Sequence, residues 1–275
     1  EIWEYEKDDE LLEIVEESKC DLIHAHSFLT FNAASNASRQ LEVPLIITLH
    51  SVYLWGALYW EALAQANRII AVGPAQSRFL GPWTRKTVVI PNGVDLDKFK
   101  PGTFQNGEEV NVLWYGRVDG RLSRGVVALD RMAPKLPRYV TIKAVGQVDV
   151  PLQNLEQQGW SSNPVEMLQE SHITFAHGRS LREAMACGSI GMLIAHGYGG
   201  RISKERLAEL NYAVDAFPQY HLPRPRPEDL LRDILDIIHS RDIASLRQEA
   251  RRIAEEYFDL NLMGSRTVSV YEEVL

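Results

Sequence analysis

Two glycine-arginine pairs in this sequence, each placed just after an apolar run, could hold a phosphate group. The run VNVLWY ends in Gly116-Arg117, and an arginine at the end of a strand can present its planar guanidinium group to a phosphate. The run ITFA is followed by a histidine, Gly178-Arg179 and the helical pattern SLREAMAC, for which Ser180 is the expected N-cap. Because a helix N-terminus offers backbone N–H groups and a partial positive charge, the two segments predict one anion site.

Further charged residues flank these two segments. Arg121 and Arg124 follow shortly after the first glycine-arginine pair. Surface arginines are common, so their place at the end of a strand favours a ligand-binding role more than their charge alone does. Glu183 lies in the first turn of the expected helix, where a carboxylate either complements the helix dipole or contacts a ligand.

Three histidines lie at the ends of two apolar runs near the N-terminus. His24 and His26 stand in HAHS and His50 stands in TLHS, and alternation along a strand puts His24 and His26 on the same side. Three imidazoles could form a zinc site, although no carboxylate or cysteine stands beside them in metal-ligand spacing. We interpret His24 as a buried, hydrogen-bonded residue and expect His26 and His50 to face a cleft.

Alternating strands and helices must position these residues. Short, almost continuous apolar runs alternate with amphipathic patterns, which is typical of parallel βα units whose sheet is covered on both faces. The first series has expected strands at 21–25, 44–49, 68–72 and 87–90 and expected helices at 8–19, 32–41, 57–66 and 75–80. The second series has expected strands at 110–115, 140–145, 173–176 and 190–194 and expected helices at 126–132, 164–170 and 180–187.

The segment PNGVDLDKFKPG separates the two series. Its prolines, its Asn-Gly pair and its charged residues break the alternating pattern and mark a domain boundary. We expect an N-terminal domain at 1–93, a second domain at 94–260 and a C-terminal helix at 261–275 that crosses back to the first domain. Both domains are expected to be α/β, Rossmann-like and doubly wound, with ligands beyond the carboxyl ends of the strands.

The composition argues against some classes of protein. The 275 residues carry a formal net charge of −8, which argues against nucleic acid as a partner. Cys20 and Cys187 stand far apart and in no metal-ligand spacing, so a reducing, cytoplasmic setting is the simplest interpretation. No apolar stretch reaches the length of a membrane span.

Several motifs occur in an order that resembles a known family. They are HAHS, TLHS, PNGVD at 91–95 with Phe99 and Pro101, GR at 116–117, VGQ at 145–147, EAMACG at 183–188 and the closing VYEEVL. This ordered set resembles the family-4 retaining glycosyltransferases of GT-B fold, and the resemblance covers nearly the whole chain. It implies a hexosyltransferase that needs neither a metal ion nor a cofactor. Such an enzyme moves a sugar from a nucleoside-diphosphate sugar, for example a UDP-sugar, to an acceptor hydroxyl with retention of anomeric configuration.

The resemblance also implies roles for individual residues. Arg117 is similar to the family's diphosphate-binding arginine, and Arg124, with Arg121 as the alternative, stands near a lysine that neutralises the same group. Glu183 resembles the glutamate that binds the nucleotide ribose, and His26 resembles the histidine that points at the transferred sugar. The loop QQGWS resembles the one that lies along the nucleobase. The remaining expected donor-binding residues are His50, Gly116, Gly159, Trp160, Gly178, Arg179, Ser180 and Leu181.

Three features complicate the resemblance. Phe175 stands where the family has a glutamate, eight positions before Glu183, that anchors the sugar hydroxyls. Only one expected helix precedes HAHS, where family members have several strands, so we expect an incomplete N-terminal sheet. Its edge would be covered by a second copy of the chain, as a homo-oligomer, or by a missing N-terminal segment. Asp95-Leu96-Asp97 mimics a metal-binding DxD motif but is expected to form a turn at this linker.

Two alternative functions stay open at this point. A nucleotide-sugar epimerase can share the architecture, and a catalytically inactive nucleotide-sugar-binding module would keep the donor site alone. The acceptor is left open as a sugar, a lipid-linked glycan or a small molecule. The expected location is cytoplasmic, with peripheral attachment to the inner face of the membrane as an alternative.

Overall fold

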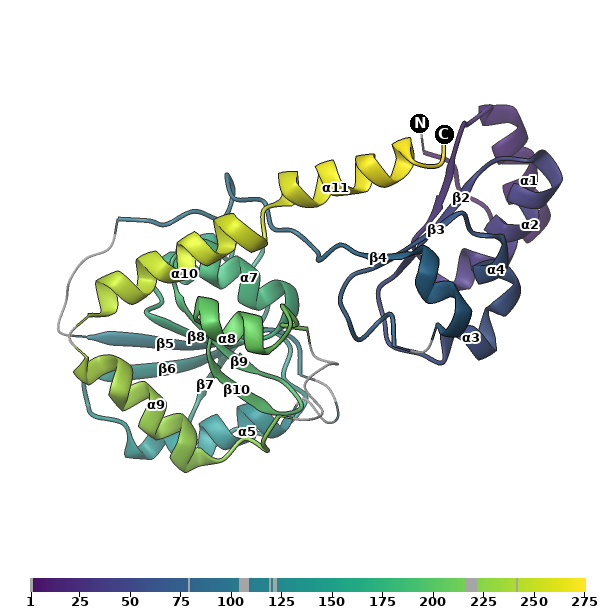
Figure 1. The fold of residues 1–275 in the computed structure, drawn as a ribbon. Coiled ribbons are helices and arrows are strands. Elements are labelled where there is room, and N and C mark those ends of the chain that lie inside the picture. The colour runs from purple at the N-terminus through teal and green to yellow at the C-terminus, as the bar shows by residue number, and fades with distance from the viewer. Residues whose placement is uncertain are drawn as a thin grey trace. The chain divides into compact units, whose positions relative to one another are not determined.

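The computed structural model divides the chain into two units (Figure 1). It describes residues 2–78, 80–103, 109–118, 120, 123–215, 222–240 and 242–275. Unit 1 comprises Glu1–Pro91 and Met263–Leu275, and unit 2 comprises Asn92–Leu262. The boundaries expected from the sequence lie after residues 93 and 260. Within the described ranges, no helix is both long enough and apolar enough to cross a membrane.

Unit 1 is built on a parallel sheet. Its described strands run in the order β1-β2-β3-β4 and all pair in parallel. The strands are β1 (Ile23–Ala25), β2 (Leu45–Leu49), β3 (Arg68–Ala71) and β4 (Thr87–Val89). The helices that precede or connect them are α1 (Asp8–Ser18), α2 (Phe31–Leu41), α3 (Trp55–Leu58) and α4 (Trp60–Gln65), with 3-10 turns at Phe28–Thr30 and Gly81–Lys86.

Apolar layers cover both faces of the unit 1 sheet. On one face, Leu45 and Ile47 of β2 pack with Phe31 of α2 and Leu63 of α4. On the other face the C-terminal helix α11 (Leu260–Glu272) places Val270 among the alternate residues of the strands. Because both faces are buried, β2 is apolar at every position but one, which matches the continuous run in the sequence.

Unit 2 is built on a larger, mostly parallel sheet. Its described strands run in the order β10-β9-β8-β5-β6-β7, and only β10 pairs antiparallel among them. They are β5 (Val110–Tyr115), β6 (Val140–Val145), β7 (Glu156–Gln158), β8 (Ile173–Ala176), β9 (Ile190–Ile194) and β10 (Tyr198–Arg201). The prediction of two α/β units with parallel sheets is confirmed.

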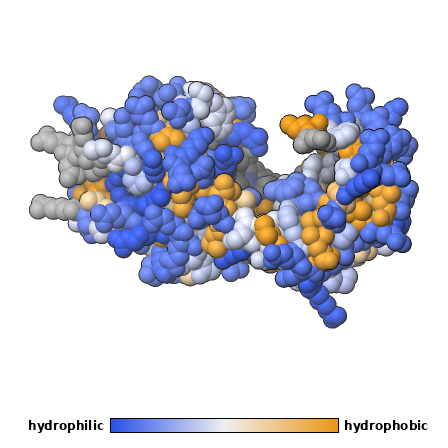
Figure 2. All heavy atoms as spheres, turned by 90° about the horizontal axis from the view of Figure 1, so that it is seen from above, coloured by the Kyte–Doolittle hydropathy of each residue, from blue (hydrophilic) through white to orange (hydrophobic). Residues whose placement is uncertain are grey.

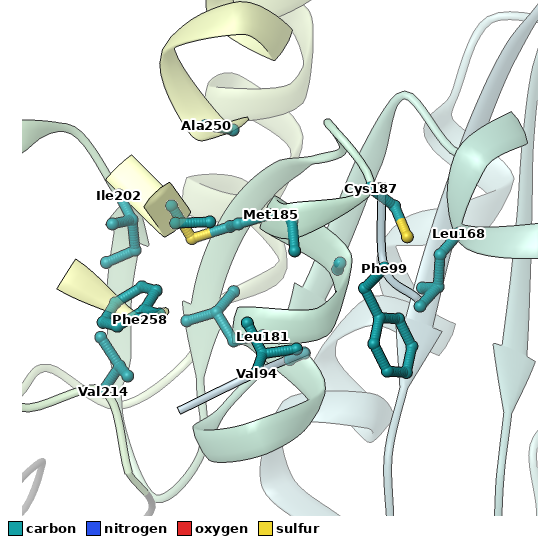
Figure 3. Close-up of a cluster of buried hydrophobic side chains, with 14 of the residues drawn as sticks. Val94, Phe99, Leu168, Leu181, Met185, Cys187, Ile202, Val214, Ala250 and Phe258 are labelled. Atoms are coloured by element: carbon teal, nitrogen blue, oxygen red, sulfur yellow. The ribbon is translucent and has the colours of Figure 1, made fainter. Parts of the chain in front are cut away.

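Helices cover the two faces of the unit 2 sheet (Figure 1). One face packs against α5 (Ser123–Met132) and α9 (Pro227–His239), and the other packs against α7 (Gly178–Ala186) and α10 (Ile243–Tyr257). Two shorter helices, α6 (Val165–Glu170) and α8 (Lys204–Glu209), complete the described set. Figure 3 shows how Leu181 and Met185 of α7 lie in the second of these layers together with Phe258, at the end of α10.

Two sequence-based expectations about local structure are wrong. Residues 74–78 form turns instead of the expected helix. The segment is too short to offset the cost of helix nucleation, and the Ser77 hydroxyl donates to the Pro74 carbonyl oxygen at 2.9 Å, which favours a local turn. The second concerns α7, which begins at Gly178 with His177 as its N-cap. Ser180 therefore lies inside the first turn, and Glu183 lies beyond the first turn in which it was expected.

The segments on either side of the boundary residues pair with each other inside unit 2. The backbone N–H of Val94 donates to the Phe258 carbonyl at 2.7 Å, and the N–H of Leu260 donates to the Val94 carbonyl at 3.0 Å. Gly93 lies so close to this pairing that a Cβ atom on it would be 2.5 Å from the Leu260 Cα atom. A side chain at this position would therefore force the two segments apart.

We expect Gly93→Ala to lower the free energy of unfolding by about 1–3 kcal/mol, the usual scale for overpacking. The matched control is Gly264→Ala in α11, where a Cβ atom would meet nothing within 4 Å and alanine favours the helix. Thermal unfolding should show a lower midpoint for Gly93→Ala and an equal or higher midpoint for Gly264→Ala. Equal midpoints for the two variants would show that the two segments can move apart without a loss of stability.

Candidate functional site

Two glycine turns meet at the carboxyl edge of the unit 2 sheet. Gly116 follows β5 and Gly146 follows β6, and the N–H of Gly116 donates to the Val145 carbonyl at 3.0 Å. Gly146 has a φ of +117°, and a Cβ atom on it would lie 2.1 Å from the Gly116 carbonyl oxygen, so only glycine fits. On its other side, Gly116 faces the hydroxyl of Ser180, which would lie 3.6 Å from a Cβ atom on Gly116. The ends of two strands thus meet the start of α7.

The first turn of α7 directs backbone N–H groups towards this edge. Gly178 has a φ of +56°, and its own N–H donates to the Val214 carbonyl at 2.7 Å. The first intrahelical bond runs from the N–H of Leu181 to the His177 carbonyl at 3.4 Å. The N–H groups of Arg179 and Ser180 precede that bond, so a ligand anion can accept from them. Leu181 is fully buried and its N–H is used, so it contributes packing instead of a donor.

Glu183 forms the centre of a buried polar network in the same place. Its Oε1 accepts from the Arg179 Nε at 2.7 Å and its Oε2 accepts from the Tyr115 hydroxyl at 3.0 Å. Burial, with the Glu183 carboxylate as a second cause, raises the pKa of Tyr115 above its usual range, so the phenol stays a donor. The carboxylate is therefore held in one orientation, and each oxygen keeps a second acceptor position.

An exposed aromatic ring lies beside this network. Trp160 follows the edge strand β7, and its side chain is 55% exposed. The centroids of the Trp160 and Tyr115 rings are 6.2 Å apart, in an edge-on arrangement. A Cβ atom on Gly159 would meet nothing within 4 Å. The indole therefore offers an open face on which a planar ring could stack.

The three predicted arginines have different outcomes. Arg117 follows Gly116 directly and is exposed, at the same edge as the two glycine turns. Arg124 lies in the first turn of α5 and is exposed as well. Arg121 lies outside the residues that the structure describes. The structure thus places two of the three guanidinium groups on segments that follow β5.

Sequence reasoning missed one ion pair beside α7. Both Nη atoms of Arg182 lie 3.2 Å from the carboxylate oxygens of Asp215, one from each. Arg182 is 1% exposed and Asp215 is 20% exposed, and the Phe258 ring centroid lies 5.3 Å from the guanidinium carbon. Nothing in the sequence separates Arg182 from the other polar residues of α7, and no spacing pointed to Asp215 as its partner.

The histidines form a separate group in unit 1. The two ring nitrogens of His24 lie 2.6 Å from the Tyr271 hydroxyl and 2.7 Å from the Thr48 hydroxyl. The His26 Nδ1 lies 3.1 Å from the His50 Nε2. Both nitrogens of His24 are engaged by hydroxyl groups, and His26 and His50 form a separate pair, so the three imidazoles are not arranged as a set of zinc ligands.

An apolar surface adjoins these histidines. The segments that follow β1 and β2 expose Leu29 (77%) and Leu58 (62%), and the Phe28 and Tyr53 rings contact each other with centroids 5.6 Å apart. On the face drawn in Figure 2, apolar areas likewise lie among hydrophilic ones. The carboxyl end of the unit 1 sheet therefore combines imidazoles with exposed apolar side chains.

The DxD-like segment forms a turn. The Asp95 Oδ1 accepts from the backbone N–H groups of Asp97 and Lys98, both at 3.0 Å. This side chain therefore closes its own turn.

Comparison with known proteins identifies the architecture. Residues 3–98 match a sequence-family model described as Glycosyltransferase Family 4, and no curated protein sequence matches the chain significantly. A glycosyltransferase from Rickettsia africae is similar in structure, with 16% identity and a TM-score of 0.74 over 97% of this chain and 80% of that one. HepE from Anabaena, crystallised with UDP and glucose, gives 16% identity and a TM-score of 0.72 over 97% of this chain and 81% of HepE.

The chain has the GT-B fold. A Listeria monocytogenes protein assigned as a UDP-N-acetylglucosamine 2-epimerase is less similar, with 10% identity and a TM-score of 0.58 over 99% of this chain and 81% of that one. At these identities the structural comparisons establish the fold and not the reaction.

The histidine chain predicts a pH dependence of stability. Burial, with His26 and His50 as further causes, lowers the pKa of His24 from its ordinary 6.5 to about 4. The folded state thus binds fewer protons than the unfolded state between these values. The contribution is complete above pH 6.5 and is lost as the pH falls towards 4.

We expect His24→Gln to flatten the fall of the unfolding midpoint between pH 6.5 and 4, measured by thermal unfolding at several pH values. His239→Gln, at the end of α9 in unit 2, is the control and should follow the wild-type curve. A His24→Gln curve parallel to the wild-type curve would contradict this interpretation of the cluster.

Proposed function

We propose that this protein transfers a hexose from a nucleoside-diphosphate sugar to an acceptor hydroxyl, with retention of anomeric configuration. The observation that supports this best is the meeting of the glycine turns of β5 and β6 with the first turn of α7. There, backbone N–H groups and the exposed guanidinium of Arg117 lie at one edge of the sheet. The Anabaena neighbour crystallised with UDP and glucose supports a UDP-sugar as the donor.

Each part of the donor's nucleotide has a candidate partner in unit 2. The diphosphate would accept from the N–H groups of Arg179 and Ser180 and from the Arg117 and Arg124 side chains. The free acceptor positions of Glu183 would take the ribose hydroxyls. The nucleobase would then lie against the Trp160 ring, in the loop that includes Gly159.

The proposed chemistry depends on stabilising the leaving group. When the bond from the sugar to the diphosphate breaks, negative charge grows on the phosphate, and fixed donors and guanidinium groups lower the energy of that state. Because this charge is met by arginines and N–H groups, we propose that no metal ion or organic cofactor is needed. The departing phosphate would accept the proton of the acceptor hydroxyl on the same face of the sugar. For His26, whose Nδ1 lies 3.1 Å from the His50 Nε2 in unit 1, we propose a hydrogen bond to a sugar hydroxyl.

The experiment that tests this proposal separates three functions. The protein is first screened by thermal shift against UDP, GDP, ADP and their glucose conjugates, with and without EDTA. The conjugate that binds is then incubated with the protein, and the products are followed by NMR. Free nucleotide together with a transferred or slowly hydrolysed sugar of retained configuration supports the transferase. An epimerised nucleotide-sugar would identify an epimerase, and binding without turnover would identify an inactive module.

We expect Arg117→Ala to weaken nucleoside-diphosphate binding by about 2–3 kcal/mol, or roughly 30- to 150-fold, because a charge-assisted partner of the phosphate is lost. Arg138→Ala is the matched control, since Arg138 is exposed just before β6, at the opposite edge of the same sheet. Isothermal titration with UDP and GDP measures both. Equal affinities for Arg117→Ala and the wild type would remove Arg117 from the site.

A further inference from the structure

We propose that Asp215 binds hydroxyl groups of the donor's sugar and so helps to select that sugar. This inference rests on the proposed function, and it assigns to the site a carboxylate that lies outside every motif of the sequence. Asp215 follows Val214, whose carbonyl accepts from the first N–H of α7 at 2.7 Å. Its Oδ1 would lie 3.3 Å from a Cβ atom on Gly178. The carboxylate thus lies against the turn that would hold the phosphate.

Arg182 fixes the orientation and the charge of this carboxylate. The guanidinium group approaches both carboxylate oxygens at 3.2 Å and is itself almost completely buried. A buried arginine with a ring on one side loses much of its freedom to move, so Asp215 is held in one geometry. Because Asp215 is partly exposed while Arg182 is not, the ion pair presents its acidic end to solvent.

The chemistry of this position suits a sugar and not a phosphate. A carboxylate repels the diphosphate, but the arginine partner largely cancels its charge, so the two can lie near each other. The sugar is bonded directly to the terminal phosphate, so its ring must lie within a few ångströms of the phosphate site. Each oxygen of Asp215 accepts from one Nη atom and keeps acceptor capacity for a hydroxyl. Two neighbouring hydroxyls of a hexose match that arrangement.

The other candidate side chains for this task are occupied. Phe175 is fully buried in the apolar layer under α5 and α9, so position 175 offers nothing to a ligand. The free acceptor positions of Glu183, whose oxygens already accept from Tyr115 and Arg179, are assigned to the ribose hydroxyls. Asp215 would therefore supply the acidic acceptor for the sugar. The competing explanation is that Asp215 only complements the dipole of α7, and that role predicts a change in stability without a change in sugar preference.

The experiment compares the affinities of the full chain for UDP and for UDP-glucose by isothermal titration. The variants are Asp215→Glu, which keeps the charge for Arg182 but moves the carboxylate, and Asp215→Asn. Asp236→Glu, at an exposed position of α9, is the matched control. We expect both Asp215 variants to bind UDP within about twofold of the wild type. The ratio of Kd for UDP-glucose to Kd for UDP should rise at least roughly tenfold.

Two results would overturn the proposal. An unchanged ratio of the two affinities would remove Asp215 from the sugar site. An equal loss for UDP and UDP-glucose would show that Asp215 only supports α7. If Asp215→Asn unfolds because Arg182 loses its charged partner, Asp215→Glu alone decides between these outcomes. Absence of any nucleotide binding by the wild type would instead refute the proposed function itself.

Discussion

The close approach of Gly146 to the carbonyl oxygen of Gly116 is the constraint on which the unit 2 site depends. Any side chain at position 146 would occupy the space of that oxygen, so the turns after β5 and β6 can pack together only as glycine turns. Their contact brings the end of β5 next to Ser180 and fixes where the residues after Gly116 leave the sheet. The N–H groups of α7, the Glu183 network and Arg117 therefore all lie at this edge of the sheet, because they belong to these few backbone segments.

Two arginines of α10 hold unit 2 together at the opposite edge of its sheet. Arg247 of α10 donates to the Ser171 carbonyl and, at 2.9 Å, to the Gln169 carbonyl, and burial lowers the pKa of Arg247 to about 10. Arg251 donates to the Phe99 and Ala186 carbonyls at 2.8 and 2.9 Å. Through these bonds α10 is fastened to the segment before β8, to the end of α7 and to the linker after residue 95. Each buried charge has a partner, which the low dielectric of the interior makes necessary. These bonds thus brace the unit 2 sheet at one edge, and the hydrogen-bond donors of the candidate site lie at the other.

The sequence predicted the parts of the fold that depend on local pattern. β5, β6, β8 and β9 agree with the expected apolar runs residue by residue, because most positions of each strand are apolar even where, as in β6, a polar residue is exposed. The short strands β7 and β10 were missed. The first is fully exposed and the second is rich in glycine, so both are defined by pairing with distant segments and not by their own residues.

The same distinction explains what could be predicted of the site. Residues next to strand ends, such as Gly116 and Arg117, could be found because strand ends are visible in the sequence. Others could not. The φ of +56° at Gly178, which starts α7 early, depends on the Val214 carbonyl far along the chain. The Asp215 carboxylate likewise reaches Arg182 only through the tertiary fold.

Charge is distributed unequally between the two candidate groups of residues. The unit 2 group presents guanidinium charge and oriented N–H groups, whereas burial lowers the pKa of each of the three histidines in unit 1. A neutral imidazole attracts a diphosphate only weakly, so under the proposed function the nucleotide would bind to unit 2. The same neutral imidazole can accept a hydrogen bond from a sugar hydroxyl without being protonated. In the His26–His50 contact one ring must donate and the other accept, since only one proton can lie between the two nitrogens. The tautomers of His26 and His50 are therefore coupled, and the hydrogen-bonding role of the other nitrogen of His26 depends on which of the two rings donates.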